Sequence, residues 1–327
     1  MSAHQDLNVN AIPIQKPLQS PTVMSFTQTG DPHVFLVGRP PLNEYLGFIR
    51  MLSIGGADLD NATLTRDWRL ANDRVRELEE KEADIANDVE RQPVSSALQP
   101  LVDEVMNDPT IQKSYSNVPW TIEMVKLDTL VVYQKHINLS YVEELKVKLG
   151  PSPDEETIFR LCFPLGEALP SLQVRRVAPG NVFSFVSPSN DLRFLDATFL
   201  PASQINGYAT NGRITGVVAL AVGFGCNCFN VVSAEGRLIL NNASHRAFAL
   251  RDLGITHAPC IIQHVSREEE FPVVLTQEVV GQIEHFLSRP RPPLLKDYFD
   301  DQLRRIVNVP KQNRHVRITF MPEAVDL

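Results

Sequence analysis

The chain has little of what a membrane-bound or secreted protein needs. Its longest apolar run, residues 217–224, is far shorter than the roughly 20 residues required to cross a bilayer, so no membrane span is expected. The N-terminus has no hydrophobic leader, and the four cysteines, at positions 162, 226, 228 and 260, are too irregularly spaced for a disulfide framework. The sequence therefore favours a soluble protein of the reducing cytoplasm.

Basic residues are also in short supply. The net charge is -8 and the sequence pI is about 5.5. This balance argues against a surface built as a whole to hold nucleic acid, because phosphate neutralisation needs clustered lysine and arginine. What the chain does have is length and apolar content. Its 327 residues, 43% of them hydrophobic, can bury a large core in one large domain or two modest ones.

Hydropathy patterns divide the chain into four parts. Residues 1–30 are polar and lack apolar periodicity, which predicts a flexible tail. Residues 31–115 predict a mainly helical N-terminal region, and residues 120–265 an α/β (α+β) domain. Residues 266–327 predict a C-terminal extension that prolines interrupt, with too little uninterrupted helix for a standard helix-turn-helix.

The clearest periodic segment of the N-terminal region is 64–92. Apolar residues recur there at alternating steps of four and three, charged residues lie between them, and Pro93 ends the pattern. This is the heptad seam of a long amphipathic helix. The seam either packs on its own domain, the interpretation we favour, or joins two copies of the chain or another partner helix. Shorter helices are expected over 43–52 and 96–106.

The α/β domain is predicted to begin with a strand over 122–132. Ser140 and Glu143 have the spacing of a capping box that opens a helix, and Gly150 is its expected C-terminal stop. A further strand is predicted over 157–163. Residues 172–223 then alternate short β-rich runs with turns.

The last part of the domain predicts the order strand, turn, strand, helix, strand over 228–265. The apolar, glycine-rich run 217–232 is expected to be a buried strand. Between the strand 237–240 and the helix 244–253 lies the polar turn Asn241–Arg246. Free N–H groups at a helix N-terminus attract anions, and an arginine there binds phosphate oxygens in pairs. A plain helix cap with a solvated arginine is the alternative.

Two segments resemble the ParB/sulfiredoxin-like superfamily. Residues 238–259, the second box, have the superfamily's order of strand, small-residue turn, basic pair with arginine, helix and proline-led strand. Residues 130–136, the first box, with the helix that follows, are similar to the strand, Tyr-Gln turn and helix of ParB N-terminal domains. The segment 166–211 between the boxes is longer than a compact ParB domain needs, so the resemblance implies that it is a β-rich insertion. The resemblance implies a nucleotide ligand, CTP or ATP/ADP with Mg²⁺, and a phosphate site lined by residues of both boxes. These are Gln134, His136, Asn242, Ser244, His245 and Arg246.

The chain departs from two enzymes of that superfamily. Ser244 stands where sulfiredoxin has its nucleophilic cysteine, which argues against that activity. Free-serine kinases have an acidic base in the first box, so His136 would have to replace it, with His245 as a second acid–base candidate. Nucleotide binding is therefore the leading hypothesis. A nuclease or small-molecule phosphotransferase is the alternative, and an interaction protein with an inactive pocket is the third.

For two further features we favour a structural interpretation over a functional one. Residues 289–317 hold eight lysines and arginines against three aspartates, which either form a nucleic-acid patch or balance the acidic helix over 67–90. We favour the balancing role. Cys226 and Cys228 lack a second ligand pair nearby, so buried strand residues are expected rather than a metal site.

Overall fold

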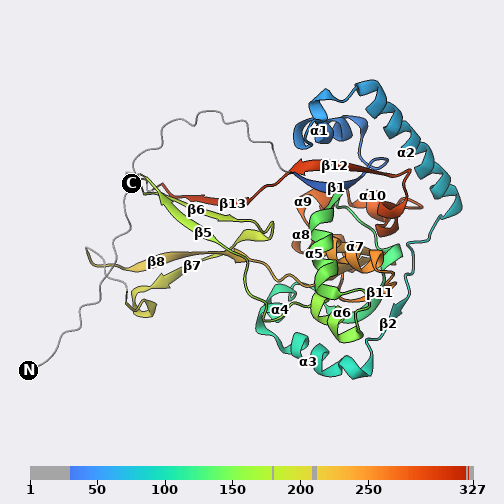
Figure 1. Ribbon diagram of the computed structural model, residues 1–327. Coiled ribbons are helices and arrows are strands. Elements are labelled where there is room, and N and C mark those ends of the chain that lie inside the picture. The colour runs from blue at the N-terminus through green and yellow to red at the C-terminus, as the bar shows by residue number, and fades with distance from the viewer. Residues whose placement is uncertain (1–29, 179, 208–211, 322, 324–327) are drawn as a thin grey trace, which may run out of the picture.

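The computed structural model describes residues 30–178, 180–207, 212–321 and 323, and it shows a body from which a β-rich arm projects (Figure 1). We call residues 166–225 and 311–323 the arm, and the remaining described residues the body. The mixture of helices and sheets confirms the α/β class. All but the last residue of the predicted tail, 1–30, lies outside the described residues. Among those described, no helix combines the length and the apolar character needed to span a membrane.

The first sheet of the body joins the two ends of the described chain. Its order is β12–β1–β4, where β1 is Gly30–Leu36, β4 is His136–Asn138 and β12 is Arg304–Pro310. All seven residues of β1 pair antiparallel with β12. The segment 266–327 is therefore not merely an appended extension, because one of its strands completes the sheet of the N-terminal region.

Two helices, α1 (Leu42–Leu52) and α2 (Asn61–Lys81), pack on this sheet. The heptad residues Leu64 and Ala71 are buried in one cluster with Tyr45 and Ile49 of α1 and with residues of β1 and β12. This part of the seam therefore packs within the chain. The predicted helix over 64–92 is too long: α2 ends at Lys81. Asp84 then takes a positive φ of 63°, a left-handed conformation that no α-helix accommodates.

The second sheet forms the main core and has the order β10–β9–β11–β3–β2. Only β9 and β11 run parallel; the other neighbours are antiparallel. The strands are β2 (Arg91–Gln92), β3 (Trp120–Lys126), β9 (Asn230–Ala234), β10 (Arg237–Asn242) and β11 (His257–His264). This confirms the predicted order of strands and helix over 228–265. The strand predicted over 122–132 is shorter, because a 3₁₀ turn, Leu127–Thr129, follows β3.

Three helices, α5 (Leu139–Leu149), α6 (Glu155–Cys162) and α7 (Ser244–Asp252), cover this sheet. Asn138, not Ser140, caps α5 by accepting a hydrogen bond from the Tyr141 N–H at 3.1 Å. The expected strand 157–163 is wrong, because those residues belong to α6. Asp154 caps that helix through the Thr157 N–H at 2.8 Å.

Short helical segments make up the rest of the body. They are the α-helices α3 (Gln99–Asn107), α4 (Pro109–Ser114), α8 (Phe271–Val274), α9 (Gln277–Val280) and α10 (Ile283–Leu287), and the 3₁₀ helices Gly56–Asp58, Ser96–Leu98, Glu268–Glu270 and Leu295–Phe299. The prolines between α10 and the last of these shape a loop whose Pro293 carbonyl accepts a hydrogen bond from the Val132 N–H at 2.9 Å.

The basic tail does balance the acidic helix. Arg289 pairs with Glu79, and Arg291 and Lys296 both pair with Glu82 at the end of α2. Arg305 of β12 pairs with Asp67 in the same helix. Four of the eight basic residues of 289–317 therefore have partners in the acidic segment, as the balancing interpretation predicts.

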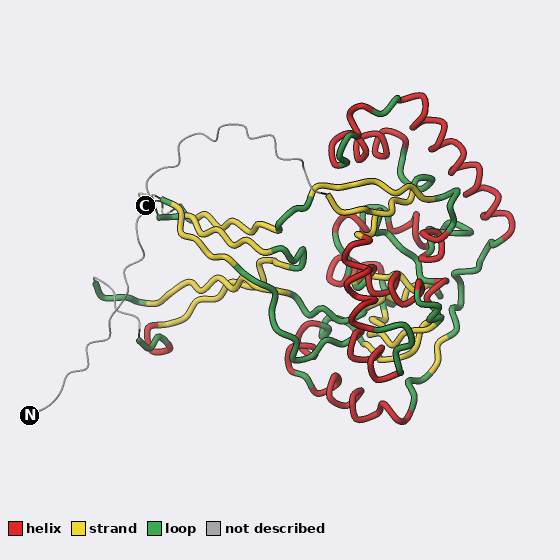
Figure 2. The backbone as a smooth tube through the Cα atoms, viewed as in Figure 1, coloured by secondary structure: helices red, strands yellow, loops and turns green. Residues whose placement is uncertain are grey.

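The arm contains two small sheets that extend from one side of the body (Figures 1 and 2). One has the order β13–β6–β5 and the other consists of β7 and β8. Their bounds are β5 (Gln173–Val177), β6 (Val182–Ser187), β7 (Leu192–Pro201), β8 (Gly216–Phe224) and β13 (Arg314–Thr319), with a 3₁₀ turn over Ala202–Gln204. The predicted insertion 166–211 therefore continues to residue 224. The run 217–232 is not one buried strand, since β8 is exposed or half-buried and β9 is separate.

Candidate functional site

The two boxes lie side by side in the structure. The Val131 N–H donates to the Leu238 carbonyl at 2.9 Å, and the Leu240 N–H donates to the Val131 carbonyl at 2.8 Å. The segments run parallel at this point. Each then enters a helix, α5 after the first box and α7 within the second, and these helices pack together. Residues 107 positions apart are thereby brought to one edge, where Asn138 and His245 meet.

Arg246 does not lie where a phosphate ligand would need it. Its side chain is buried, and its guanidinium donates to the Leu161 carbonyl and to the Asn227 side-chain oxygen, both at 2.9 Å. The last carbonyls of α6 carry partial negative charge, so a buried cation stabilises that helix end. The structure gives Arg246 this supporting contact in place of the predicted phosphate contact.

His245 also supports the fold. Its Nε2 accepts a hydrogen bond from the Asn138 N–H at 3.0 Å, which places the ring proton on Nδ1. Burial, together with the charges of His136, His33 and Arg246, lowers the pKa of His245 to about 4. The imidazole is therefore neutral at pH 7, and its lone pair is occupied. His245 cannot act as the base that the sequence suggested without first losing this bond.

His136, predicted as a phosphate-site and acid–base residue, lies in a cavity wall. Its Nδ1 lies 2.9 Å from Nδ1 of His33 on β1, so one of the two rings donates and the other accepts. Burial and the charges of His33 and Lys135 lower the pKa of His136 to about 4. Unlike His245, it lines a cavity of about 560 Å³. The sequence did not predict His33 as a neighbour of His136, because His33 lies in the N-terminal region and nothing in its local sequence links it to the first box.

The turn itself contains one unusual backbone position. Ala243 precedes α7 with a φ of 78°, a left-handed conformation that is rare for alanine, and no side chain caps the helix. Ser244 therefore does not act as the cap. Asn242 donates to the Cys228 carbonyl at 3.1 Å, and Asn241 donates to the Val274 carbonyl at 2.9 Å. The two side-chain amides thus hold the turn in place by hydrogen bonds to neighbouring segments.

Two cavities open along the first box. The larger has a volume of about 560 Å³ and the smaller about 310 Å³. Both are lined by Glu44, Tyr133, Gln134 and Lys135, so the first box forms the wall between them. The Tyr133 hydroxyl donates to the Asn241 carbonyl at 2.8 Å, and this bond fixes the wall to the second box.

The larger cavity combines apolar and charged walls. Phe48, Met51 and Leu52 of α1 supply its apolar side. Lys135 pairs there with Glu44 of α1 and with Glu278 of α9, the latter at 2.9 Å. Burial by itself would lower the pKa of Lys135, but these two carboxylates raise it above its usual value. The lysine is therefore charged and holds two elements together.

The smaller cavity is richer in cations and amides. Arg39 and Arg289 line it together with Lys135, and Glu44 is its one carboxylate. The other polar or aromatic lining residues are Trp68, Asn72, Tyr133, Gln134, Gln282, His285 and Phe286. Burial, Arg289 and Arg39 lower the pKa of His285 to about 4, so this ring is neutral at pH 7. The wall suits a ligand that carries negative charge.

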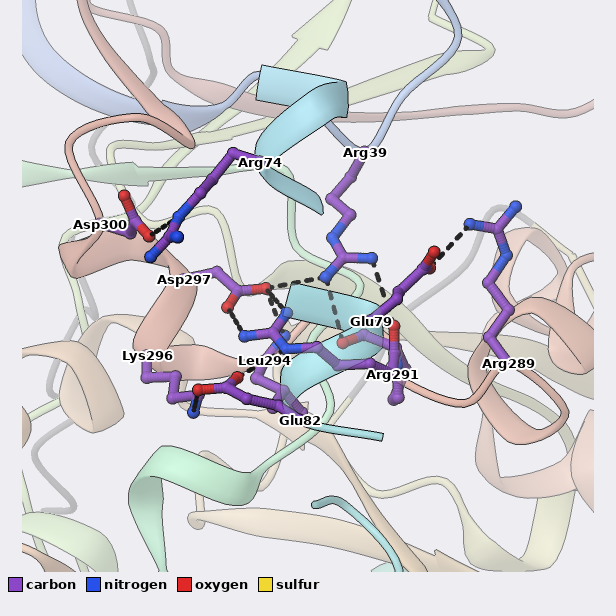
Figure 3. A network of polar contacts seen from close by, with 11 residues as sticks. Arg39, Arg74, Glu79, Glu82, Arg289, Arg291, Leu294, Lys296, Asp297 and Asp300 are labelled. Atoms are coloured by element: carbon purple, nitrogen blue, oxygen red, sulfur yellow. Dashed lines mark hydrogen bonds and ion pairs between the residues drawn. The ribbon is translucent and has the colours of Figure 1, made fainter. Parts of the chain in front are cut away.

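A buried ion network includes Arg39, which lines the smaller cavity (Figure 3). Arg291, which is 0% exposed, forms a two-point pair with Asp297, and Arg39 reaches the same carboxylate at 3.1 Å. Glu82 accepts from Arg291 and Lys296. Three cations thus share two carboxylates. The Arg39 Nε is buried without a hydrogen-bond partner among the described residues. The cluster has one positive charge in excess.

Neither a metal site nor a known relative guides the assignment further. Cys226 and Cys228 lie with their sulfurs 3.6 Å apart, and no group of three or more potential metal ligands occurs within residues 30–321, masked positions aside. No family model, curated protein or solved structure matches this chain. The ParB/sulfiredoxin-like resemblance stays a hypothesis carried by the two boxes.

Proposed function

We propose that the protein binds a nucleotide in the cleft along the first box. The single observation that carries the proposal is that Tyr133, Gln134 and Lys135 line both cavities. A nucleotide has a planar base and a charged phosphate end, and the two cavities differ in the same way. The base fits the larger cavity beside Phe48, and the phosphates fit the cation-rich smaller cavity beside Arg289.

The charges of the smaller cavity favour the phosphate end there. Arg289 is half-exposed, and its pair with Glu79 is long at 3.6 Å, so it is available to a ligand. Arg39, whose cluster has one positive charge in excess, lines the same cavity and also attracts phosphate. In this proposal the second box supports the site from behind through Asn241 and His245, and Mg²⁺ arrives with the nucleotide.

The uncapped N-terminus of α7 is the other place where the phosphates can bind. The resemblance implies that location, and the half-buried Ser244 is its accessible side chain. Two substitutions that add negative charge distinguish the two sites. Arg289→Glu removes a cation from the cleft, whereas Ser244→Glu puts a negative charge at a helix N-terminus, where it repels phosphate but stabilises the helix.

The test is the thermal stability of the purified protein with CTP, ATP, ADP or GTP, each with Mg²⁺. A ligand at about 100 times its dissociation constant adds roughly 2.7 kcal/mol to the free energy of unfolding, which raises the melting temperature. We expect one nucleotide to give this shift, Arg289→Glu to abolish it, and Ser244→Glu to leave it in place. Arg175→Glu, on the arm, is the matched control and should change nothing.

Each other result has a definite meaning. Loss of the shift in Ser244→Glu alone would place the phosphates at α7. No shift with any nucleotide would contradict the proposal and favour an interaction protein with an inactive pocket. One observation favours an enzyme as the second candidate: His136 is neutral at pH 7 and lines the larger cavity. Release or transfer of phosphate by the parent, lost in His136→Gln, is the result that this alternative requires.

A further inference from the structure

The β7–β8 ribbon has unpaired edges on both sides. Within the described part of the chain its sheet has two strands, and these pair only with each other. A two-stranded ribbon is marginally stable in water unless something covers its apolar face. Natural proteins protect such edges with charged residues or proline. Strand β8, Gly216–Phe224, has no charged residue at all.

One face of the ribbon is apolar along its length. The cross-strand pairs Phe199–Val218, Ala197–Leu220 and Phe194–Val222 lie on the same face. Their β8 members are two apart and so point the same way, and a register shift between Phe194 and Asp196 puts Phe194 opposite Val222. The side chains are open to solvent: Phe199 is 60% exposed and Val218 66%. A continuous exposed apolar strip of this kind marks an interaction surface.

Charge indicates what covers this strip. The arm has seven lysines and arginines against four aspartates and glutamates, although the whole chain has a net charge of -8. The body is therefore strongly acidic and the arm basic. Opposite charges on two parts of one chain attract one copy to another. The complementary occupant is the body of a second copy.

The body offers an apolar patch with acidic neighbours. It follows the end of α1 and consists of Met51, Leu52, Ile54 and Leu59, all exposed, with Met51 at 84%. Asp58 and Asp60 are exposed beside it. We propose that the apolar face of the β7–β8 ribbon docks on this patch of a second copy of the chain. Docking does not require a bound nucleotide, although the patch shares Met51 and Leu52 with the wall of the larger cavity.

The test is the molar mass of the full chain in solution, measured by light scattering over a range of protein concentrations. We expect the parent to form a dimer. Phe199→Asp damages the ribbon and Met51→Asp damages the patch, so each should raise the dimer dissociation constant by roughly tenfold or more, about 1.4 kcal/mol. Val147→Asp, at an 82% exposed position of α5, is the matched control and should dimerise like the parent.

A mixture of the two variants gives the decisive result. Neither variant alone has both surfaces, but the ribbon of Met51→Asp can dock on the patch of Phe199→Asp, so mixing should restore association. Val218→Asp and Leu52→Asp provide a second pair if one of the first variants fails to fold. A monomeric parent, a dimer unaffected by either substitution, or a mixture that stays monomeric would each overturn the proposal.

Discussion

At the scale of single residues, the direction of a side chain changes its role. Arg246 follows a strand end and begins a helix, the position from which an arginine commonly binds phosphate. Here it turns inward to the Leu161 carbonyl. Replacing it would leave the end of α6 without its donor, so an Arg246→Ala variant would report on stability rather than on a ligand. Substitution of the half-exposed Arg289 is therefore the better test of ligand binding.

The buried histidines predict a dependence of stability on pH. The pKa of His245 is about 4 in the folded protein and near its usual 6.5 in the unfolded chain. Between these values the unfolded state binds more protons, so the stability that is present above pH 6.5 is lost as the pH falls toward 4. His245→Gln keeps an acceptor for the Asn138 N–H but does not titrate.

Urea unfolding at several pH values between 7 and 4.5 measures this effect. We expect the free energy of unfolding of His245→Gln to fall less steeply with acid than that of the parent. Part of the slope that remains comes from His136 and His285, whose pKa values are also lowered to about 4. His315→Gln, on the arm, is the control. Parallel curves for the parent and His245→Gln would contradict the argument.

At the scale of elements, periodicity identified α2 but not its end. The heptad pattern continues past Lys81, yet the chain there turns through Asp84 so that Glu82 can meet Arg291 and Lys296. The opposite error occurred at α6, where a short apolar run fits a strand or a helix equally well. Asp154 and the burial of Phe159 and Cys162 on one side select the helix.

A substitution in the buried seam of α2 should lower the stability of the protein without changing its oligomeric state. Leu64 is 0% exposed and packs on the first sheet, so Leu64→Ala should lower the free energy of unfolding by about 2–5 kcal/mol. Leu70→Ala, on the outer face of the same helix, should have little effect. Denaturant unfolding and light scattering check both points. A change in molar mass with Leu64→Ala would show that the seam also joins copies.

At the scale of the whole molecule, one ion network joins distant parts of the chain. Asp297 is 1% exposed and pairs with both Arg39 and Arg291, which lie in the N-terminal and C-terminal regions (Figure 3). Asp297→Ala would leave both arginines buried without this partner, and should lower the free energy of unfolding by about 3–5 kcal/mol. Asp301→Ala, a solvent-exposed ion-pair control, should cost about 0–1 kcal/mol. Equal effects would mean that the network contributes no more than a surface pair.

The sequence by itself determined the local elements and one long-range relation. Breakers and caps act within a few residues, which is why Gly150 ended its helix as expected and the elements over 228–265 came in the predicted order. Opposite charge in the two segments 67–90 and 289–317 was visible without coordinates, and the structure pairs them.

Only the tertiary structure decided which residues meet. The pairing of β1 with β12, the neighbourhood of His33 and His136, and the inward turn of Arg246 depend on contacts between residues far apart in sequence. The cleft along the first box arises in the same way, because its walls come from α1, the first box and α9. Local pattern fixes a helix or a strand, but the direction of a side chain is fixed by the packing of the elements around it.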